Sequence, residues 1–270
     1  MLNKETVLPI NTTIDGGSNF DWGRASGDYA RFRDIYPEEF YQRIIEMGLC
    51  TEGQKVLDLG TGTGVLPRNL YRFGASFTGT DISANQAEEA KRLSKENGMD
   101  IEYVIIPAEE LDFPAGSFDV VTASQCFIYF DDNVVIPKIH EVLKPGGHYC
   151  VMWMAWLPYE DEIARASESL VLKYNPSWTG AGAQRHELGI PGWAKTLFTV
   201  NRSFVYDLKL PFTRESWHGR IRACRGIGAS SLSDEIIVEF DREHRCLLDG
   251  VPDTFEILHY VAMLDLVKVG

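Results

Sequence analysis

The sequence is short of positive charge. Its 270 residues include 26 Lys and Arg against 39 Asp and Glu, which gives a formal net charge of −13. A surface this acidic repels the phosphates of nucleic acids and of anionic lipids. We therefore expect neither nucleic acid nor a membrane as a partner of this chain.

Cysteine motifs and long apolar runs are also missing. The cysteines lie far apart without a CxxC pair, and the histidines show no HxxxH spacing, so we expect neither a disulfide framework nor a metal site. No apolar run approaches the roughly 18 residues of a membrane span, and the first residues lack the pattern of a signal peptide. These absences favour the reducing cytoplasm. The five cysteines are Cys50, Cys126, Cys150, Cys224 and Cys246.

What the sequence does have is a regular alternation of strand-like and helix-like segments. Short β-branched runs alternate with helical apolar spacing about five times, which is typical of an α/β protein with a parallel sheet covered on both faces. The last segment, 254–269, fits a strand or a helix, and its β-branched and aromatic residues favour a strand. The predicted strands are 55–60, 77–83, 101–107, 117–125, 147–156, 201–212 and 254–269. The predicted helices are 37–49, 64–74, 84–98, 132–143, 160–174 and two within 213–249.

The domain organisation follows from this alternation. No linker-like stretch divides the chain, so we expect a single domain over residues 1–270. Its core covers about 38–155, where the alternation is regular. Helical insertions at about 156–200 and 213–250 are expected to form a cap.

A glycine-rich stretch follows the first predicted strand and reads D-x-G-x-G-x-G from Asp58 to Gly64. A dinucleotide fingerprint, G-x-G-x-x-G, requires glycine where Val65 or Pro67 stands, so that fingerprint fails in both registers. Asp81 ends the second strand, where a carboxylate accepts hydrogen bonds from the two hydroxyls of a ribose. The pattern therefore indicates an adenosine with an amino-acid arm more than a dinucleotide.

Four blocks in this order resemble the class I S-adenosylmethionine-dependent methyltransferases that act on small molecules. They are VLDLGTGTG (56–64), TGTDIS (78–83), PAEELDFPAGSFDVVTASQ (107–125) and LKPGG (143–147). The resemblance implies S-adenosylmethionine as cofactor. It also implies a Rossmann-like, seven-stranded, mostly parallel sheet with helices on both faces and an inserted helical cap.

The resemblance also implies residue roles. The methionine moiety would be lined by Asp58, Gly60, Thr61 and Gly62, and the ribose would be held by Asp81. Adenine would lie against Ile82, Ala108 and Glu109. One departure is Pro107, which stands where relatives often carry an acidic residue facing the adenine amine.

Two further segments resemble one part of this family. The stretch ASQCFIYFD (123–131) resembles the trans-aconitate methyltransferase-like group, which would place Gln125 near the methyl group or the substrate. The segment 28–40 resembles the segment that closes over the cofactor in these enzymes, here with Tyr29 and Arg33. Arg33 would pair with the methionine carboxylate, although both side chains are equally compatible with a surface helix.

The stretch SWHGRIRACRG (216–226) gathers positive charge in an acidic chain. If it is helical, His218, Arg222 and Arg225 share one face, beside Trp217. The ordinary interpretation is a solvated basic face. The alternative, which we favour here, is a cradle that recognises an acidic, carboxylate-bearing methyl acceptor.

The sequence assigns no catalytic residue, because a sulfonium methyl donor is already activated and a general base is optional. The candidates for such a base or positioning group are His218, Tyr29 and Gln125. Two other functions stay open at this point. One is an NAD-dependent oxidoreductase on a similar fold, and the other is a non-catalytic regulatory protein that binds S-adenosylmethionine.

Overall fold

The computed structural model describes residues 14–18, 20–25, 31–32 and 36–270. The chain forms two compact units, each assembled from separate segments. Unit 1 comprises residues 1–35, 155–185 and 206–260. Unit 2 comprises residues 36–154, 186–205 and 261–270, and its first segment nearly coincides with the predicted core. Whether the chain is a single domain with a cap stays a prediction.

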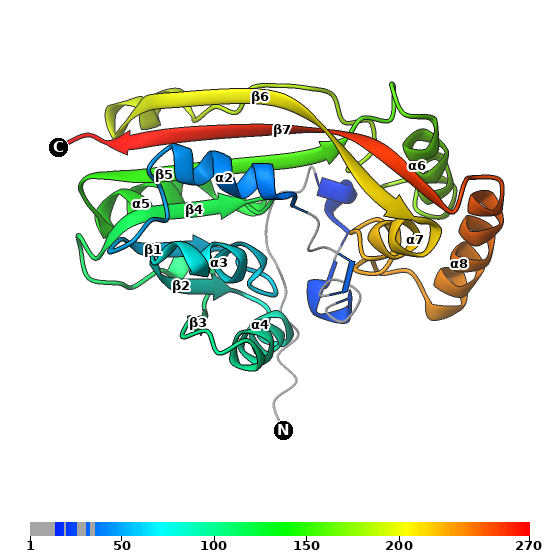
Figure 1. Cartoon of the computed structure of the whole chain (residues 1–270), viewed down its shortest axis with the longest axis horizontal. Helices are drawn as coiled ribbons and strands as arrows, with labels where there is room; N and C mark the ends of the chain where they lie inside the picture. The colour runs from blue at the N-terminus through cyan, green and yellow to red at the C-terminus, as the bar shows by residue number, and fades with distance from the viewer. Residues whose placement is uncertain (1–13, 19, 26–30, 33–35) are drawn as a thin grey trace. The chain divides into compact units, whose positions relative to one another are not determined.

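The central element is a seven-stranded sheet with the strand order β3-β2-β1-β4-β5-β7-β6. Its strands are β1 (Lys55–Leu59), β2 (Ser76–Asp81), β3 (Glu102–Ile105), β4 (Phe118–Ser124), β5 (Leu143–Trp156), β6 (Phe198–Thr213) and β7 (Thr254–Lys268). The arrow of β7 points opposite to those of β5 and β6 (Figure 1). The predicted α/β fold with a mostly parallel, seven-stranded sheet is therefore confirmed, and 254–269 is a strand.

The first five strands are parallel, as their apolar sequences predict. Strand β1 pairs with β2 and with β4, β2 pairs with β3, and β4 pairs with β5, all in parallel register. Four of the five residues of β1 are buried, because a parallel strand in the middle of such a sheet is covered on both faces. The carboxyl ends of β1, β2 and β4 therefore lie at one edge of the sheet.

Helices connect these strands. Those of unit 2 are α2 (Glu38–Glu46), α3 (Val65–Leu70), α4 (Ala84–Glu96) and α5 (Asp132–Val142), with short 3-10 turns η3 (Tyr71–Phe73), η4 (Ala108–Glu110), η5 (Phe127–Tyr129) and η6 (Gly192–Thr196). Local signals position them. The side chain of Ser83 caps α4, the side chain of Asp131 caps α5, and Gly74 ends η3 at a φ of +88°.

The core of unit 2 lies between the sheet and α5. The buried face of α5 packs against side chains of β1, β4, β5 and β7. Its members include Leu57, Leu59, Val121, Ala123, Val135, Ile139, Tyr149, Val151, Leu264 and Leu266. These apolar contacts fix the strand ends that carry the predicted cofactor residues.

Unit 1 is mainly helical. It contains η1 (Ile14–Gly17), η2 (Trp22–Ala25), α6 (Glu162–Tyr174), α7 (Arg214–Arg222) and α8 (Asp234–Asp249), and α8 packs against both α6 and α7. Within the described residues, no helix is both long enough and apolar enough to cross a membrane.

The fold constrains Gly64, which precedes α3 at a φ of +73°. A Cβ atom there would lie 2.3 Å from the hydroxyl of Tyr103, whose ring is buried and whose hydroxyl lies 2.9 Å from Ser94 Oγ. Gly98 provides a matched control, because its φ is +66° but a Cβ atom would meet nothing within 4 Å.

We expect Gly98→Ala to reduce the free energy of unfolding by about 1 kcal/mol, from backbone strain alone. Gly64→Ala should reduce it by a further ~1–3 kcal/mol, because the new methyl group must displace a packed ring. Urea unfolding of the two variants measures the difference. Equal losses would show that Tyr103 does not restrict this position.

Candidate cofactor site

The loop from Gly60 to Gly64 leaves β1 in a conformation that side chains disfavour. Gly60, Gly62 and Gly64 have φ values of +56°, +57° and +73°. A Cβ atom on Gly60 would lie 2.6 Å from the Cβ atom of Cys126. The backbone N–H of Thr61 donates to the carbonyl of Thr80 over 2.8 Å, so the loop stays against the end of β2. Glycine is therefore required here by conformation and by space.

Asp81, the last residue of β2, is fixed by two backbone donors. Its Oδ2 accepts from the N–H of Gly62, and its Oδ1 accepts from the N–H of Ser83, each over 2.8 Å. Burial raises the pKa of this carboxyl group, while the two N–H groups act to lower it. Each oxygen of a carboxylate retains acceptor capacity beyond one hydrogen bond, so Asp81 is able to receive two ligand hydroxyls.

Asp58 lies inside the sheet, with 2% of its surface exposed. Its Oδ1 accepts a hydrogen bond of 2.6 Å from Thr122 Oγ1 on the neighbouring strand β4. Burial raises the pKa of Asp58 to about 6, and the hydrogen bond from Thr122 opposes this increase. Asp58 thus links β1 to β4 two residues before the glycine loop begins.

The predicted adenine-side residues follow β2 and β3. Ile82 is partly buried next to Asp81, and Ala108 is buried in η4. Glu109 Oε1 accepts from the backbone N–H of Asp131 over 3.0 Å, which ties η4 to the start of α5. The structure therefore brings Ile82 to the same end of the sheet as the glycine loop, and it gives Glu109 a structural contact.

Gln125 ends β4 in a strained conformation, with a φ of +68°. Its backbone N–H donates to the carbonyl of Met152 over 3.0 Å, and its side-chain Nε2 donates to the carbonyl of Met154 over 2.6 Å. Left-handed conformations of residues other than glycine persist where the surrounding structure holds them, and they cluster at functional sites. Gln125 is therefore held at this edge of the sheet by its backbone and by its amide.

Cys126 is a contact that the sequence did not reveal. Its Sγ donates to the carbonyl of Leu59 over 3.0 Å, and its Cβ occupies the space beside Gly60. The two residues are far apart in sequence, and no motif connects them. The only signal in the sequence is the position of Cys126 directly after β4, whose carboxyl end lies beside that of β1.

The remaining cofactor predictions, Tyr29 and Arg33, fall on residues 26–30 and 33–35, which lie outside the described residues. Their proposed closure over the cofactor stays a prediction. Tyr36, the first residue of the described segment 36–270, has its hydroxyl 3.0 Å from Ser124 Oγ at the end of β4.

The basic stretch 216–226 does not form one helical face. Helix α7 ends at Arg222, so Arg225 lies beyond it, and the prediction that His218, Arg222 and Arg225 share a helix face is wrong. Ala223 is the C-cap of α7, and the residues that follow it form turns. The prediction that 216–226 is one helix therefore placed the end of α7 too late in the sequence.

These side chains are also tied to other parts of unit 1. His218 is buried, with Nδ1 2.9 Å from His244 Nδ1 and Nε2 3.3 Å from Asp241. Arg222 Nε lies 3.0 Å from the other oxygen of Asp241. Trp217 is buried and donates from Nε1 to Ser167 Oγ over 2.9 Å.

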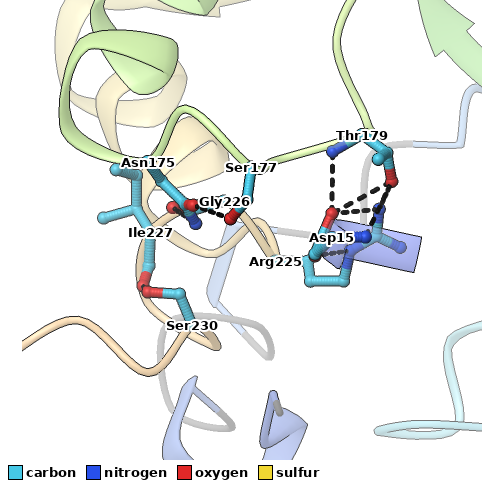
Figure 2. A network of polar contacts seen from close by, with 8 residues as sticks. All are labelled: Asp15, Asn175, Ser177, Thr179, Arg225, Gly226, Ile227 and Ser230. Carbon is cyan, nitrogen blue, oxygen red and sulfur yellow. Dashed lines mark hydrogen bonds and ion pairs between the residues drawn. The ribbon is translucent and has the colours of Figure 1, made fainter. Parts of the chain in front are cut away.

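Arg225 forms a buried ion pair with Asp15 (Figure 2). Its Nε donates to Asp15 Oδ2 over 2.5 Å, and a terminal nitrogen donates to Thr179 Oγ1 over 3.1 Å. Asp15 Oδ1 also accepts from the backbone N–H of Thr179 over 2.7 Å. Both arginines of the predicted acid-binding cradle thus face carboxylates of the chain itself.

The Arg225–Asp15 pair generates a stability prediction. Arg225→Ala leaves the buried Asp15 carboxylate without its cation, so we expect a loss of about 3–5 kcal/mol in the free energy of unfolding. Arg222→Ala, at a site that is 36% exposed, should cost about 1 kcal/mol or less. The double variant Asp15→Ala/Arg225→Ala should lose less than the sum of its single variants. Chemical denaturation of the parent, the three single variants and the double variant measures these losses, and a loss below 1 kcal/mol for Arg225→Ala would contradict a structural role.

Asp58 generates a pH prediction. A carboxyl group whose pKa is raised in the folded protein stabilises it at low pH, and this contribution is lost as the pH rises through the folded pKa. Because its pKa increases from 3.8 to about 6 on folding, Asp58 lowers the free energy of unfolding by about 3 kcal/mol at a pH above the folded pKa. The stability of Asp58→Asn relative to the parent protein should therefore increase between pH 4 and pH 7.

Asp119 is the control for the sign of this effect. Lys144 and the backbone N–H of Lys55 lower the pKa of Asp119, although its partial burial acts in the opposite direction. The stability of Asp119→Asn relative to the parent should therefore decrease as the pH rises, and most of this decrease should fall below pH 4. Urea titrations at several pH values measure both slopes, and a flat difference for Asp58→Asn would rule out the raised pKa.

Comparison with known proteins finds relatives of part of this chain. Residues 56–147 match the family model described as Methyltransferase domain. The chain is 34% identical over 106 residues to the ubiquinone biosynthesis O-methyltransferase of Bordetella avium, covering 38% of this chain and 44% of that protein. It is 30% identical over 173 residues to the protein of the same name from Psychrobacter arcticus, covering 55% and 66%. The chain thus spans about half the length of the curated relatives it matches.

Solved structures agree in fold. The YcgJ protein from Bacillus subtilis superposes with a TM-score of 0.54 at 20% identity, covering 85% of this chain and 98% of that one. A protein from Bacillus halodurans gives a TM-score of 0.55 at 16% identity, covering 86% and 100%. Residues 56–147 therefore match a methyltransferase domain, and the chain shares the Rossmann-like α/β fold of these solved structures.

Proposed function

We propose that this chain is an enzyme that transfers a methyl group from S-adenosylmethionine to a small molecule. The observation that carries the proposal is the Asp81 carboxylate, which the N–H groups of Gly62 and Ser83 hold at the carboxyl end of β2. Two carboxylate oxygens in fixed positions suit the two vicinal hydroxyls of a ribose. The matched methyltransferase domain contains this residue and the whole glycine loop.

The start of α3 argues against a dinucleotide. A pyrophosphate is normally bound by free N–H groups at a helix N-terminus. Here Pro67 supplies no N–H group in the first turn of α3, and Val65 and Pro67 are both buried. This turn therefore suits a ligand without a diphosphate, which disfavours the NAD-dependent oxidoreductase.

S-adenosylmethionine supplies a methyl group that is already activated on a sulfonium. The residues of this chain bind and align the donor. Asp58, Gly60, Thr61 and Gly62 form the wall for the methionine moiety, and Ile82, Ala108 and Glu109 form the wall for adenine. Gln125, fixed by its bonds to Met152 and Met154, borders the position of the transferred group.

The chemical class of the methyl acceptor is a separate part of the proposal. The predicted acidic acceptor requires Arg222 and Arg225, but both face carboxylates of unit 1, so neither arginine supports it. The matched relatives are named O-methyltransferases, which supports an oxygen as the accepting atom. The trans-aconitate methyltransferase-like grouping is supported only by the stretches 28–40 and 123–131.

Calorimetric titration with S-adenosylmethionine, S-adenosylhomocysteine and NAD tests the cofactor. We expect both adenosyl compounds to bind and NAD not to bind. Asp81→Asn removes a charged acceptor, and a hydrogen bond to a charged group contributes about 1.5–3 kcal/mol, so the affinity should fall about 10- to 100-fold. Asp100→Asn, an exposed carboxylate before the amino end of β3, is the control and should bind normally.

Binding of NAD alone would overturn the proposal in favour of an oxidoreductase. Binding of S-adenosylmethionine without methyl transfer to any member of a panel of phenols, alcohols and small acids would favour the regulatory protein. An unchanged affinity in Asp81→Asn would show that this carboxylate does not hold the ribose.

A further inference from the structure

The end of β4 and the turn that follows it are tied to three separate elements of unit 2. Ser124 Oγ lies 3.0 Å from the hydroxyl of Tyr36, which directly precedes the N-cap of α2. Gln125 is bonded to β5 through its backbone N–H and through its side-chain amide. Cys126 Sγ donates to the carbonyl of Leu59, the last residue of β1, over 3.0 Å. These contacts hold Cys126 against the glycine loop.

The ring of Tyr36 is a firm support for this turn. It stacks on Phe40 with ring centroids 4.2 Å apart and planes 9° apart, and it meets Tyr41 edge-on at 6.2 Å. Both of these α2 side chains are buried. Because the ring is packed against them, its hydroxyl reaches Ser124 from a fixed position.

Cys126 constrains the glycine loop in two ways. Its hydrogen bond to the Leu59 carbonyl fixes the plane of the peptide group between Leu59 and Gly60, since a peptide group is planar. Its Cβ and Sγ atoms also fill the space beside Gly60, where a Cβ atom on the glycine would lie 2.6 Å and 2.9 Å from them. The φ of +56° at Gly60 is therefore supported by a hydrogen bond and by the bulk of the same side chain.

The thiol of Cys126 keeps its proton, which this hydrogen bond requires. Burial raises the pKa of Cys126 well above its ordinary value, and the negative charges of Asp58 and Asp81 act in the same direction. A protonated thiol is a weak donor and a poor nucleophile. Cys126 therefore suits a supporting role in the site and not a covalent one.

We propose that Cys126 is a positioning residue for the methyl donor, because it holds the peptide group of Leu59 and Gly60 in the donor-binding conformation before the donor arrives. The assignment rests on the proposed methyl transfer, in which the amino-acid arm of S-adenosylmethionine lies along Gly60 to Gly62. A loop that is already in its binding conformation does not have to be ordered by the ligand, so its affinity is higher. Cys126 acts through this loop and does not need to touch the donor.

Amide hydrogen exchange of the full chain without ligand measures this support. The backbone N–H groups of Thr61 and Gly62 are both bonded to the end of β2, so they exchange only when the loop opens. In Cys126→Ala, which removes Sγ but keeps Cβ, we expect both groups to exchange about fivefold faster, as expected for the loss of one hydrogen bond. These rates are taken relative to the amides in the middle of β1, which report opening of the whole unit.

The affinity for S-adenosylhomocysteine, measured by calorimetry, should fall by a similar factor in Cys126→Ala. Cys126→Ser keeps an O–H donor near the Leu59 carbonyl, so it should recover part of the affinity and of the slow exchange. Cys150→Ala is the matched control. Cys150 is fully buried in β5, which is not adjacent to β1, so this variant should lose stability but keep the parent's affinity and loop exchange.

Three outcomes in a parent protein that binds S-adenosylhomocysteine overturn the assignment alone. The first is an unchanged affinity and exchange in Cys126→Ala, which would show that the side chain only fills space. The second is faster exchange of all amides alike, which would show a general loss of stability. The third is a weaker affinity with unchanged loop exchange, which would assign Cys126 a direct contact with the donor. A parent protein that binds neither adenosyl compound would overturn the proposed function and this assignment together.

Discussion

The hydrogen bond from the N–H of Gly62 to the carboxylate of Asp81 is the contact on which the site depends. It joins the turn after β1 to the last residue of β2, and Ser83 holds the other oxygen of the same carboxylate. The turn reaches this position because its glycines adopt positive φ values in a space that Cys126 and Tyr103 close to side chains. A parallel sheet supplies the frame, since it ends β1, β2 and β4 at one edge.

Much of this frame was predictable from the sequence, and the reason is physical. Buried parallel strands need apolar runs, and chain reversals need glycine, so β1, β2 and the loop between Asp58 and Gly64 stand out locally. Asp81 stands out as a carboxylate at the end of such a strand. What the sequence did not show are the partners that fill the space around the glycines, because Cys126 and Tyr103 reach them only through the tertiary fold.

The basic stretch shows the opposite case. Its charges are local in sequence, but the groups that neutralise them are distant, with Asp15 meeting Arg225 and Asp241 meeting Arg222. A cluster of positive charge in an acidic chain therefore indicated internal ion pairs as readily as a ligand site.

The central claim is that this edge of the sheet holds the adenosine of a methyl donor. A crystal structure of the protein with S-adenosylhomocysteine is its most direct test. The account predicts the two ribose hydroxyls within hydrogen-bond distance of the Asp81 carboxylate, with the amino-acid arm along Gly60 to Gly62. Density for the ligand away from Asp81, or a loop that opens and breaks the bond between Gly62 and Asp81, would contradict it.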